Sequence, residues 1–111
     1  MKPEEVAINA ARKSQHPDFK LGAVLVKHRQ VLDVKTNINS GTFSPGVCAE
    51  TRLLKNPPRA GAYNATIYVA RVRRSDGRIA MAKPCSKCAT SARSRGINKI
   101  FFTTDGGEWD Y

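Results

Sequence analysis

Three cysteines and one glutamate are the residues of this chain whose types and spacing point to chemistry. Cys48 and Glu50 stand two positions apart in a Cys-Ala-Glu triplet. Cys85 and Cys88 form a Cys-x-x-Cys motif directly after Pro84, and the chain has no other cysteine. Thiolates at such spacing are ligands that Zn²⁺ prefers in proteins. The pattern therefore predicts one zinc ion held by three cysteines, with a carboxylate beside it.

The incomplete ligand set predicts a catalytic zinc rather than a structural one. Three protein ligands leave the fourth tetrahedral position for a water molecule, which loses a proton far more easily on the metal than in bulk. Glu50 is then placed to accept that proton without ligating the metal. The alternative is a structural zinc with His16 or His28 as its fourth ligand, although such sites do not need a neighbouring carboxylate.

Both cysteine motifs are predicted to begin a helix. Cys48 opens a short helix that Asn56-Pro57-Pro58 ends, and Pro84 precedes a helix from Cys85 to about Arg95 with Gly96 after its last turn. The free N–H groups and the dipole at a helix N-terminus favour the thiolate, which is the form that binds metal.

The remaining elements form a pattern typical of a layered α/β domain. We expect a helix over 3–15, a strand hairpin over 23–26 and 31–34, a loop over 37–47, and strands over 65–72 and 98–103 with a turn at 75–78. The two later strands should be parallel, joined by a right-handed crossover. The fold class is therefore a three-layer helix–sheet–helix sandwich with a mixed sheet, formed by a single domain over residues 1–111.

The two motifs together resemble those of the zinc-dependent cytidine deaminase-like superfamily. The resemblance rests on Cys48-Ala49-Glu50 and Pro84-Cys85-Ser86-Lys87-Cys88, and extends to the strand at 22–26 and to residues 96–100. It implies a hydrolase that converts a cytosine base to uracil, with Zn²⁺ held between two helix N-termini and Glu50 as proton shuttle. The chain is similar to a minimal, phage-type cytidine or deoxycytidylate deaminase, and relatives of this size usually assemble into homo-oligomers.

Two features of the resemblance point to different branches of the superfamily. Cysteine as the first ligand, at Cys48, is similar to free cytidine deaminases and blasticidin deaminases. The predicted helix between the last two strands, with no room for a closing hairpin after them, is similar to the parallel-strand branch, which holds the nucleotide and polynucleotide enzymes.

The resemblance also implies which residues meet the substrate. Asn39 is the residue expected to hydrogen-bond the sugar, with Asn37 as the other candidate, and the backbone of Ala49 is expected to read the base edge. Phe43 is expected to stack on the base. The alternative is that the asparagines only shape the loop and that Phe43 packs into the core.

Arg52 is expected to compensate the charge of the metal site. Three thiolates on Zn²⁺ leave a net charge of −1, and Arg52 stands one turn of helix after Cys48. The alternative is that Arg52 is exposed or faces a substrate phosphate.

The chain is strongly basic, with a formal net charge of +10 at pH 7. The excess is densest over 71–99, where a single acid, Asp76, stands among nine cationic residues: Arg71, Arg73, Arg74, Arg78, Lys83, Lys87, Arg93, Arg95 and Lys99. We expect the arginines of 71–78 to project beyond the sheet. Such an excess favours a phosphate-bearing partner, and the alternative is a surface that only keeps the protein in solution.

Three hypotheses on function follow. The first is a deaminase of a cytosine-containing nucleoside or nucleotide; the second is the same chemistry on single-stranded DNA or RNA, including tRNA. The third is a zinc-stabilised nucleic-acid-binding module without catalysis, which would have no need of Glu50.

The sequence also bears on localisation. No run of residues reaches the length of a membrane span, and the first residues lack the apolar core of a signal peptide. Cysteines spaced for metal fit a reducing compartment. We therefore expect a cytoplasmic protein that does not contact a membrane.

Overall fold

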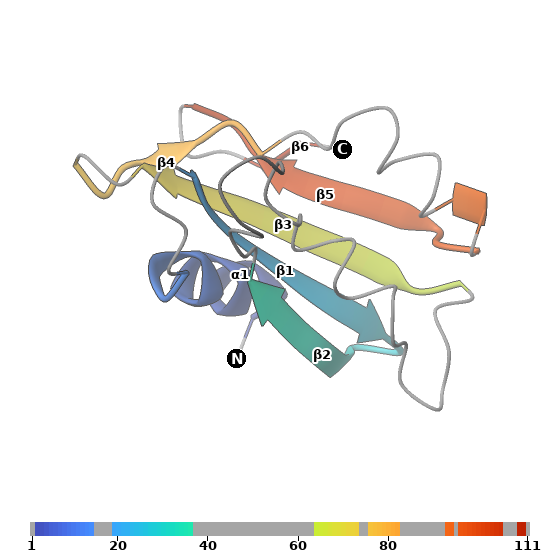
Figure 1. Ribbon diagram of the computed structural model, residues 1–111. Coiled ribbons are helices and arrows are strands. Elements are labelled where there is room, and N and C mark those ends of the chain that lie inside the picture. The colour runs from blue at the N-terminus through green and yellow to red at the C-terminus, as the bar shows by residue number, and fades with distance from the viewer. Residues whose placement is uncertain are drawn as a thin grey trace, which may run out of the picture.

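One mixed sheet organises the protein (Figure 1). The computed structural model describes residues 2–14, 19–36, 64–73, 76–82, 93–94, 96–105 and 109–110. The elements are α1 (Pro3–Arg12), β1 (Phe19–Lys27), β2 (Gln30–Thr36), β3 (Thr66–Arg73), β4 (Ile79–Ala80), β5 (Lys99–Thr103) and β6 (Trp109–Asp110). The strand order is β2-β1-β3-β5-β6, with β4 paired to β3. Among the described strands only β3 and β5 pair in parallel, so the predicted α/β fold with a mixed sheet is confirmed.

The first helix forms where its sequence predicts it but ends earlier than expected. Pro3 occupies the first turn, where its missing N–H is not needed, and Glu4 and Glu5 complement the positive end of the helix dipole. The helix ends at Arg12, not at residue 15 as predicted. The Lys13 and Ser14 N–H groups donate to carbonyls three residues back, which tightens the last turn into a 3₁₀ form and stops the helix.

The β1–β2 hairpin is longer than the sequence predicted and turns at two residues. His28 and Arg29 lie between Lys27 and Gln30, which pair across the hairpin, and they have φ angles of 52° and 63°. These angles match the left-handed turn that suits the twist of a tight hairpin. Its strands extend over 19–27 and 30–36 because β1 pairs with β3 over residues 19–26 and with β2 over residues 22–27.

Both faces of the central strands are buried. On one face α1 packs against β1 and β3 (Figure 1), and the core there comprises Ala7, Ala11, Val24, Val26, Ala70 and Val72. On the opposite face a second core comprises Ala23, Leu25, Ala65, Ile67, Val69, Ala82, Ile97 and Phe102. The apolar run over 65–72 is therefore a strand covered on both sides, as predicted.

The close packing of α1 depends on Gly22 in β1. A Cβ atom at this position would lie 2.5 Å from both the Ala11 nitrogen and the Ala7 oxygen, which are backbone atoms of α1. No side chain fits in this space, so the helix backbone lies directly against the strand.

Two short strands were not predicted. β4 pairs with the end of β3, and β6 pairs antiparallel with β5, where Trp109 lies opposite Thr103. Trp109 is half-buried, and its ring meets the Tyr68 ring edge-on with the centroids 5.8 Å apart. This apolar contact holds β6 against the sheet. The expectation that no closing hairpin follows the last long strand was therefore wrong. No helix in the described ranges is long and apolar enough to cross a membrane.

Candidate active site

The residues predicted to carry out the chemistry all lie outside the described ranges. This holds for the metal ligands Cys48, Cys85 and Cys88, for Glu50, and for the substrate-contact and charge-compensating candidates Asn39, Phe43, Ala49 and Arg52. Within the described ranges, no group of three or more His, Cys, Asp or Glu side chains could hold a metal ion. What the structure does show is where the described strands end, and so where the two segments that carry these residues, 37–63 and 83–92, begin.

Both of these segments depart from the same level of the sheet. Thr36, the last residue of β2, pairs with Gly22, and Gly22 pairs with Ala70 of β3. Ala70 follows Val69, which pairs with Phe102 next to the carboxyl end of β5. The Ala82 N–H donates to the carbonyl oxygen of Thr103 at 2.9 Å, so residue 83 also continues from this level. We call this row, from Thr36 to Ala82, the motif edge.

The distances along the motif edge allow the two cysteine motifs to meet. Thr36 and Ala82 are separated by three to four interstrand spacings, or roughly 15–20 Å. Cys85 follows Ala82 by three residues, a reach of at most about 11 Å. Cys48 follows Thr36 by twelve residues, which is ample chain to cover the remaining distance.

Thr103 holds the motif edge together. Its side chain is fully buried, and its hydroxyl donates to the Ala80 carbonyl at 2.8 Å and accepts the Arg71 N–H at 3.2 Å. It occupies the point where β3 ceases to pair with β5 and begins to pair with β4. The sequence alone marks Thr103 only as one more β-branched residue at the end of a strand, so its role was not predicted.

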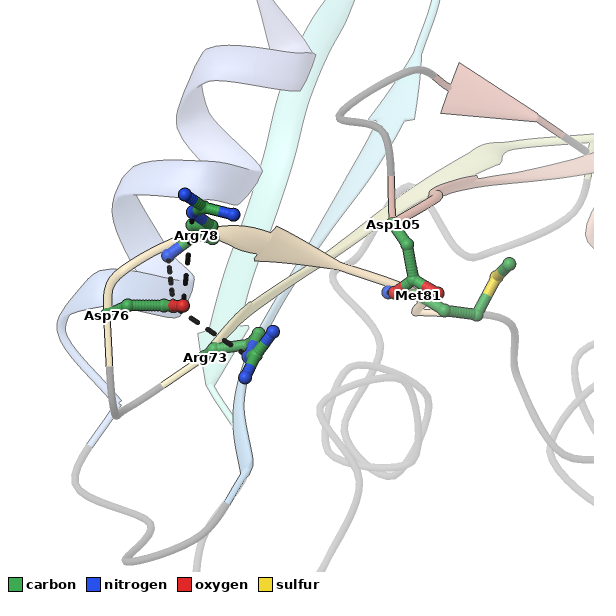
Figure 2. A network of polar contacts seen from close by, with 5 residues as sticks. All are labelled: Arg73, Asp76, Arg78, Met81 and Asp105. Atoms are coloured by element: carbon green, nitrogen blue, oxygen red, sulfur yellow. Dashed lines mark hydrogen bonds and ion pairs between the residues drawn. The ribbon is translucent and has the colours of Figure 1, made fainter.

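Asp105 adds a second attachment to the residues just before the cysteine motif. Its carboxylate oxygen Oδ1 accepts the Met81 N–H at 2.9 Å (Figure 2). Residues 81 and 82 are thus tied to residues 105 and 103 by one hydrogen bond each. The start of the segment that carries Cys85 and Cys88 is therefore fixed to the end of β5.

The crossover that follows returns to the opposite end of the sheet. The Asn64 N–H donates to the Gly96 carbonyl at 2.7 Å, and the Asn98 N–H donates to the Ala65 carbonyl at 2.8 Å. Gly96 has a φ of 88°, and its N–H donates to the Arg93 carbonyl, in agreement with the glycine predicted after the end of a helix. Residues 93–94 are helical, whereas the rest of the predicted 85–95 helix lies outside the described residues.

The β3–β4 hairpin places positive charge beside the motif edge. Asp76 lies between two guanidinium groups, 3.8 Å from Arg73 Nε and 3.9 Å from Arg78 Nε (Figure 2). Both arginine side chains are exposed, and one carboxylate leaves this pair with a net positive charge.

Arg71 does not project beyond the sheet, contrary to the prediction. Its Nε atom is buried, and its Nη1 atom lies 3.5 Å from the Met81 carbonyl oxygen. The reason is that Arg71 follows the buried face of β3, where residues 67 and 69 also point.

Comparison with known families identifies the chain. Residues 3–104 match the family model of the cytidine and deoxycytidylate deaminase zinc-binding region. The chain belongs to this family. The match includes both cysteine motifs and the motif edge from which their segments depart. Among curated proteins, none matches this sequence.

Solved structures of deaminases share the fold. The dCMP deaminase of cyanophage S-TIM5, in complex with dCMP and dUMP, superposes with a TM-score of 0.66 at 19% identity, over 94% of this chain and 84% of that chain. The cytidine deaminase of Mycobacterium leprae gives a TM-score of 0.62 at 17% identity, over 96% and 87% of the two chains. That of Mycobacterium tuberculosis gives 0.61 at 20% identity, over 89% and 79%. The likeness confirms the α/β fold of this deaminase family.

Proposed function

We propose that this deaminase is zinc-dependent and hydrolyses the exocyclic amine of a cytosine base in a nucleoside or nucleotide, which yields uracil and ammonia. The observation that carries the proposal is the motif edge. Two segments that are distant in sequence, one with the Cys-Ala-Glu triplet and one with the Cys-x-x-Cys motif, depart from the same level of one sheet.

The donor set suits zinc. Cys48, Cys85 and Cys88 would supply three soft thiolate ligands, a set that Zn²⁺ accepts while keeping one position open. Zinc bound in this way would lower the pKa of a water molecule toward neutrality. The N–H groups of residues 81 and 82, which precede the 83–92 segment, donate to the Asp105 carboxylate and to the Thr103 carbonyl oxygen, which favours a fixed position for two of the ligands.

Glu50 is proposed as the proton carrier. Its carboxylate takes a proton from the attacking water, delivers it to the ring nitrogen of cytosine, and later protonates the departing amine. The oxygen of the water ends on the ring carbon, and its protons leave with ammonia or remain on the uracil ring. Asn39, Phe43 and the backbone of Ala49 are proposed to hold sugar and base, and Arg52 to offset the negative charge of three thiolates.

The closing strand bears on which substrate is used. The likeness to the parallel-strand branch rested on a predicted helix between the last two strands and on the expected lack of a closing hairpin. β3 and β5 are parallel as expected, but β6 pairs antiparallel with β5. Together with cysteine as first ligand, this favours a free cytosine nucleoside over a nucleotide. A polynucleotide substrate remains the second candidate, because exposed Arg73 and Arg78 lie beside the motif edge.

Ammonia release from the zinc-loaded protein tests the proposal. The substrates are cytidine, deoxycytidine, their monophosphates, blasticidin and a cytosine-rich oligonucleotide. We expect about one zinc per chain and turnover of at least one cytosine substrate. Cys85→Ala should lose both, whereas Ser86→Ala, inside the same motif, should keep both. A protein without zinc, or one whose zinc content is unchanged in Cys85→Ala, would contradict the proposal.

A further inference from the structure

A second site lies at the end of the sheet remote from the motif edge. A cleft of about 690 Å³ forms between the start of α1, the β1–β2 turn and the start of β3. Among the residues that line it are Lys2, Glu5, Lys27, His28, Arg29 and Tyr68. It centres on the level where Val26 pairs with Thr66, four residues along β1 from Gly22 of the motif edge, or about 13 Å away. We call it the basic cleft.

The charge of the basic cleft is predominantly positive. Lys2, Lys27 and Arg29 carry positive charges, whereas Glu5 is the carboxylate among the described lining residues of the cleft. Lys2, His28 and Arg29 are exposed, and no ion pair within the described part of the chain engages these three. Cationic groups gathered around a concave surface attract an anion more strongly than the same charges dispersed over a convex one.

The backbone conformation of the β1–β2 turn points to a binding role for its two side chains. His28 and Arg29 both have positive φ angles, of 52° and 63°. Asn-Gly is the pair that adopts this turn with least strain, because a Cβ atom disfavours the left-handed region. Residues held in such a conformation occur disproportionately where their side chains bind a ligand. Here the strained positions carry an imidazole and a guanidinium at the rim of the basic cleft.

The inner wall of the basic cleft is apolar and aromatic. Tyr68 is half-buried, and its ring stacks on Phe101 with centroids 5.1 Å apart and planes 17° apart. Burial and, to a lesser degree, the Glu4 carboxylate raise the pKa of the Tyr68 phenol. Its hydroxyl therefore stays protonated at neutral pH and can donate a hydrogen bond. Val26 and Pro3 supply further apolar surface.

We propose that the basic cleft binds a small phosphate ester. Guanidinium, ammonium and imidazole N–H groups all donate hydrogen bonds to phosphoryl oxygens, and Arg29, Lys2 and His28 present one of each kind. The organic part of the ligand lies against Tyr68 and Val26. The volume of the cleft lies within the range that is usual for small-molecule binding sites. None of the described lining residues of the basic cleft is among those proposed for deamination, so the two proposals can be tested independently.

A double substitution in the turn tests the site without endangering the fold. His28→Asn with Arg29→Gly creates the pair that the turn prefers, so the variant should fold at least as stably as the parent. It removes two of the proposed phosphate donors at once. Lys13→Gln, at the exposed end of α1, serves as the control for loss of a positive charge elsewhere.

The probe is ribose 5-phosphate, measured by calorimetry and by NMR shifts of backbone amides on the zinc-loaded full chain. We expect saturable binding, shifts at residues 27–29 and 68, and affinity lower by at least about tenfold in the double variant. Lys13→Gln should bind as the parent does, and cytidine turnover should be unchanged in both variants. Unchanged affinity in the double variant, shifts elsewhere, no binding, or binding of a cytosine-rich oligonucleotide but not of ribose 5-phosphate would each overturn the proposal.

Discussion

At the scale of single residues, Glu50 is the side chain whose removal should separate chemistry from folding. It is proposed to carry protons and is not needed as a metal ligand, because three thiolates already hold the ion. Replacing its carboxylate by an amide removes the proton-carrying group with little change in size.

We expect Glu50→Gln to keep its zinc and its thermal unfolding temperature and to lose about a hundredfold or more in turnover, as is usual for a lost acid–base group. Metal analysis and steady-state kinetics on the same preparation measure both. Turnover equal to that of the parent would mean that another residue carries the proton.

Thr103, in contrast to Glu50, is expected to affect folding rather than the chemical step. It stabilises the motif edge, from which the proposed metal ligands depart. Thr103→Val keeps shape and burial but leaves the Ala80 carbonyl and the Arg71 N–H without the hydroxyl that they share. We expect a loss of about 2 kcal/mol in the free energy of unfolding, because both hydrogen bonds of a buried hydroxyl are lost. Urea unfolding measures it, together with zinc affinity, which should fall as the motif edge loosens. Thr103→Ser retains the hydroxyl and should preserve zinc affinity; equal affinity in the valine and serine variants would remove Thr103 from this role.

At the scale of elements, the contact between α1 and β1 is the least tolerant of change. A Cβ at position 22 would meet backbone atoms of α1 at 2.5 Å, and a backbone cannot move aside as a side chain can. We expect Gly22→Ala to destabilise the protein by about 3 kcal/mol. The matched substitution is Gly77→Ala, where no atom lies within 4 Å but φ is 72°. It should cost about 1 kcal/mol, since only the left-handed conformation opposes it.

Chemical unfolding of the two variants compares their free energies of unfolding. A smaller loss for Gly22→Ala than for Gly77→Ala would contradict the packing argument.

The β3–β4 hairpin is the element on which binding of a polynucleotide can be tested. Arg73 and Arg78 are exposed, so their joint replacement by Gln should reduce the salt dependence of oligonucleotide binding. Each lost phosphate contact lowers the log–log slope by about 0.7 for a single strand. Fluorescence titrations at several salt concentrations give the slope. The control replaces Arg12 and Lys13, which are exposed at the end of α1. If both double variants change the slope equally, the charge is diffuse and the hairpin has no special part in binding.

At the scale of the whole molecule, zinc and folding are expected to be coupled. With 111 residues, the chain has a modest core, and a metal that binds only the folded state adds stability by mass action. Free zinc about a hundredfold above its dissociation constant adds about 2.7 kcal/mol, which raises the unfolding temperature by roughly 10 °C for a domain of this size. Calorimetry with and without a chelator measures the shift. Cys85→Ala should show no shift, and a parent protein that contains zinc yet unfolds at the same temperature with chelator would contradict the coupling.

The sequence by itself predicted the chemistry, and it determined the main strands. Zinc ligation and proton transfer depend on residue type and short spacing, both visible in Cys48-Ala49-Glu50 and in Cys85 and Cys88. The long apolar runs that became β3 and β5 were predicted with their parallel pairing, because continuous β-branched stretches are buried on both faces. The turn residues Gly77 and Gly96 were also predicted from local chemistry alone.

Only the tertiary structure decided how these pieces are held. β4 and β6 have two residues each, too few for any periodic pattern, and exist because they pair with β3 and β5. Thr103 and Gly22 matter through partners between 11 and 32 residues away, which no local pattern contains. The basic cleft likewise joins the start of α1, the β1–β2 turn and β3. Hydrogen bonds and close packing act through space, whereas composition and spacing act along the chain, and this separates what the sequence predicted from what required the fold.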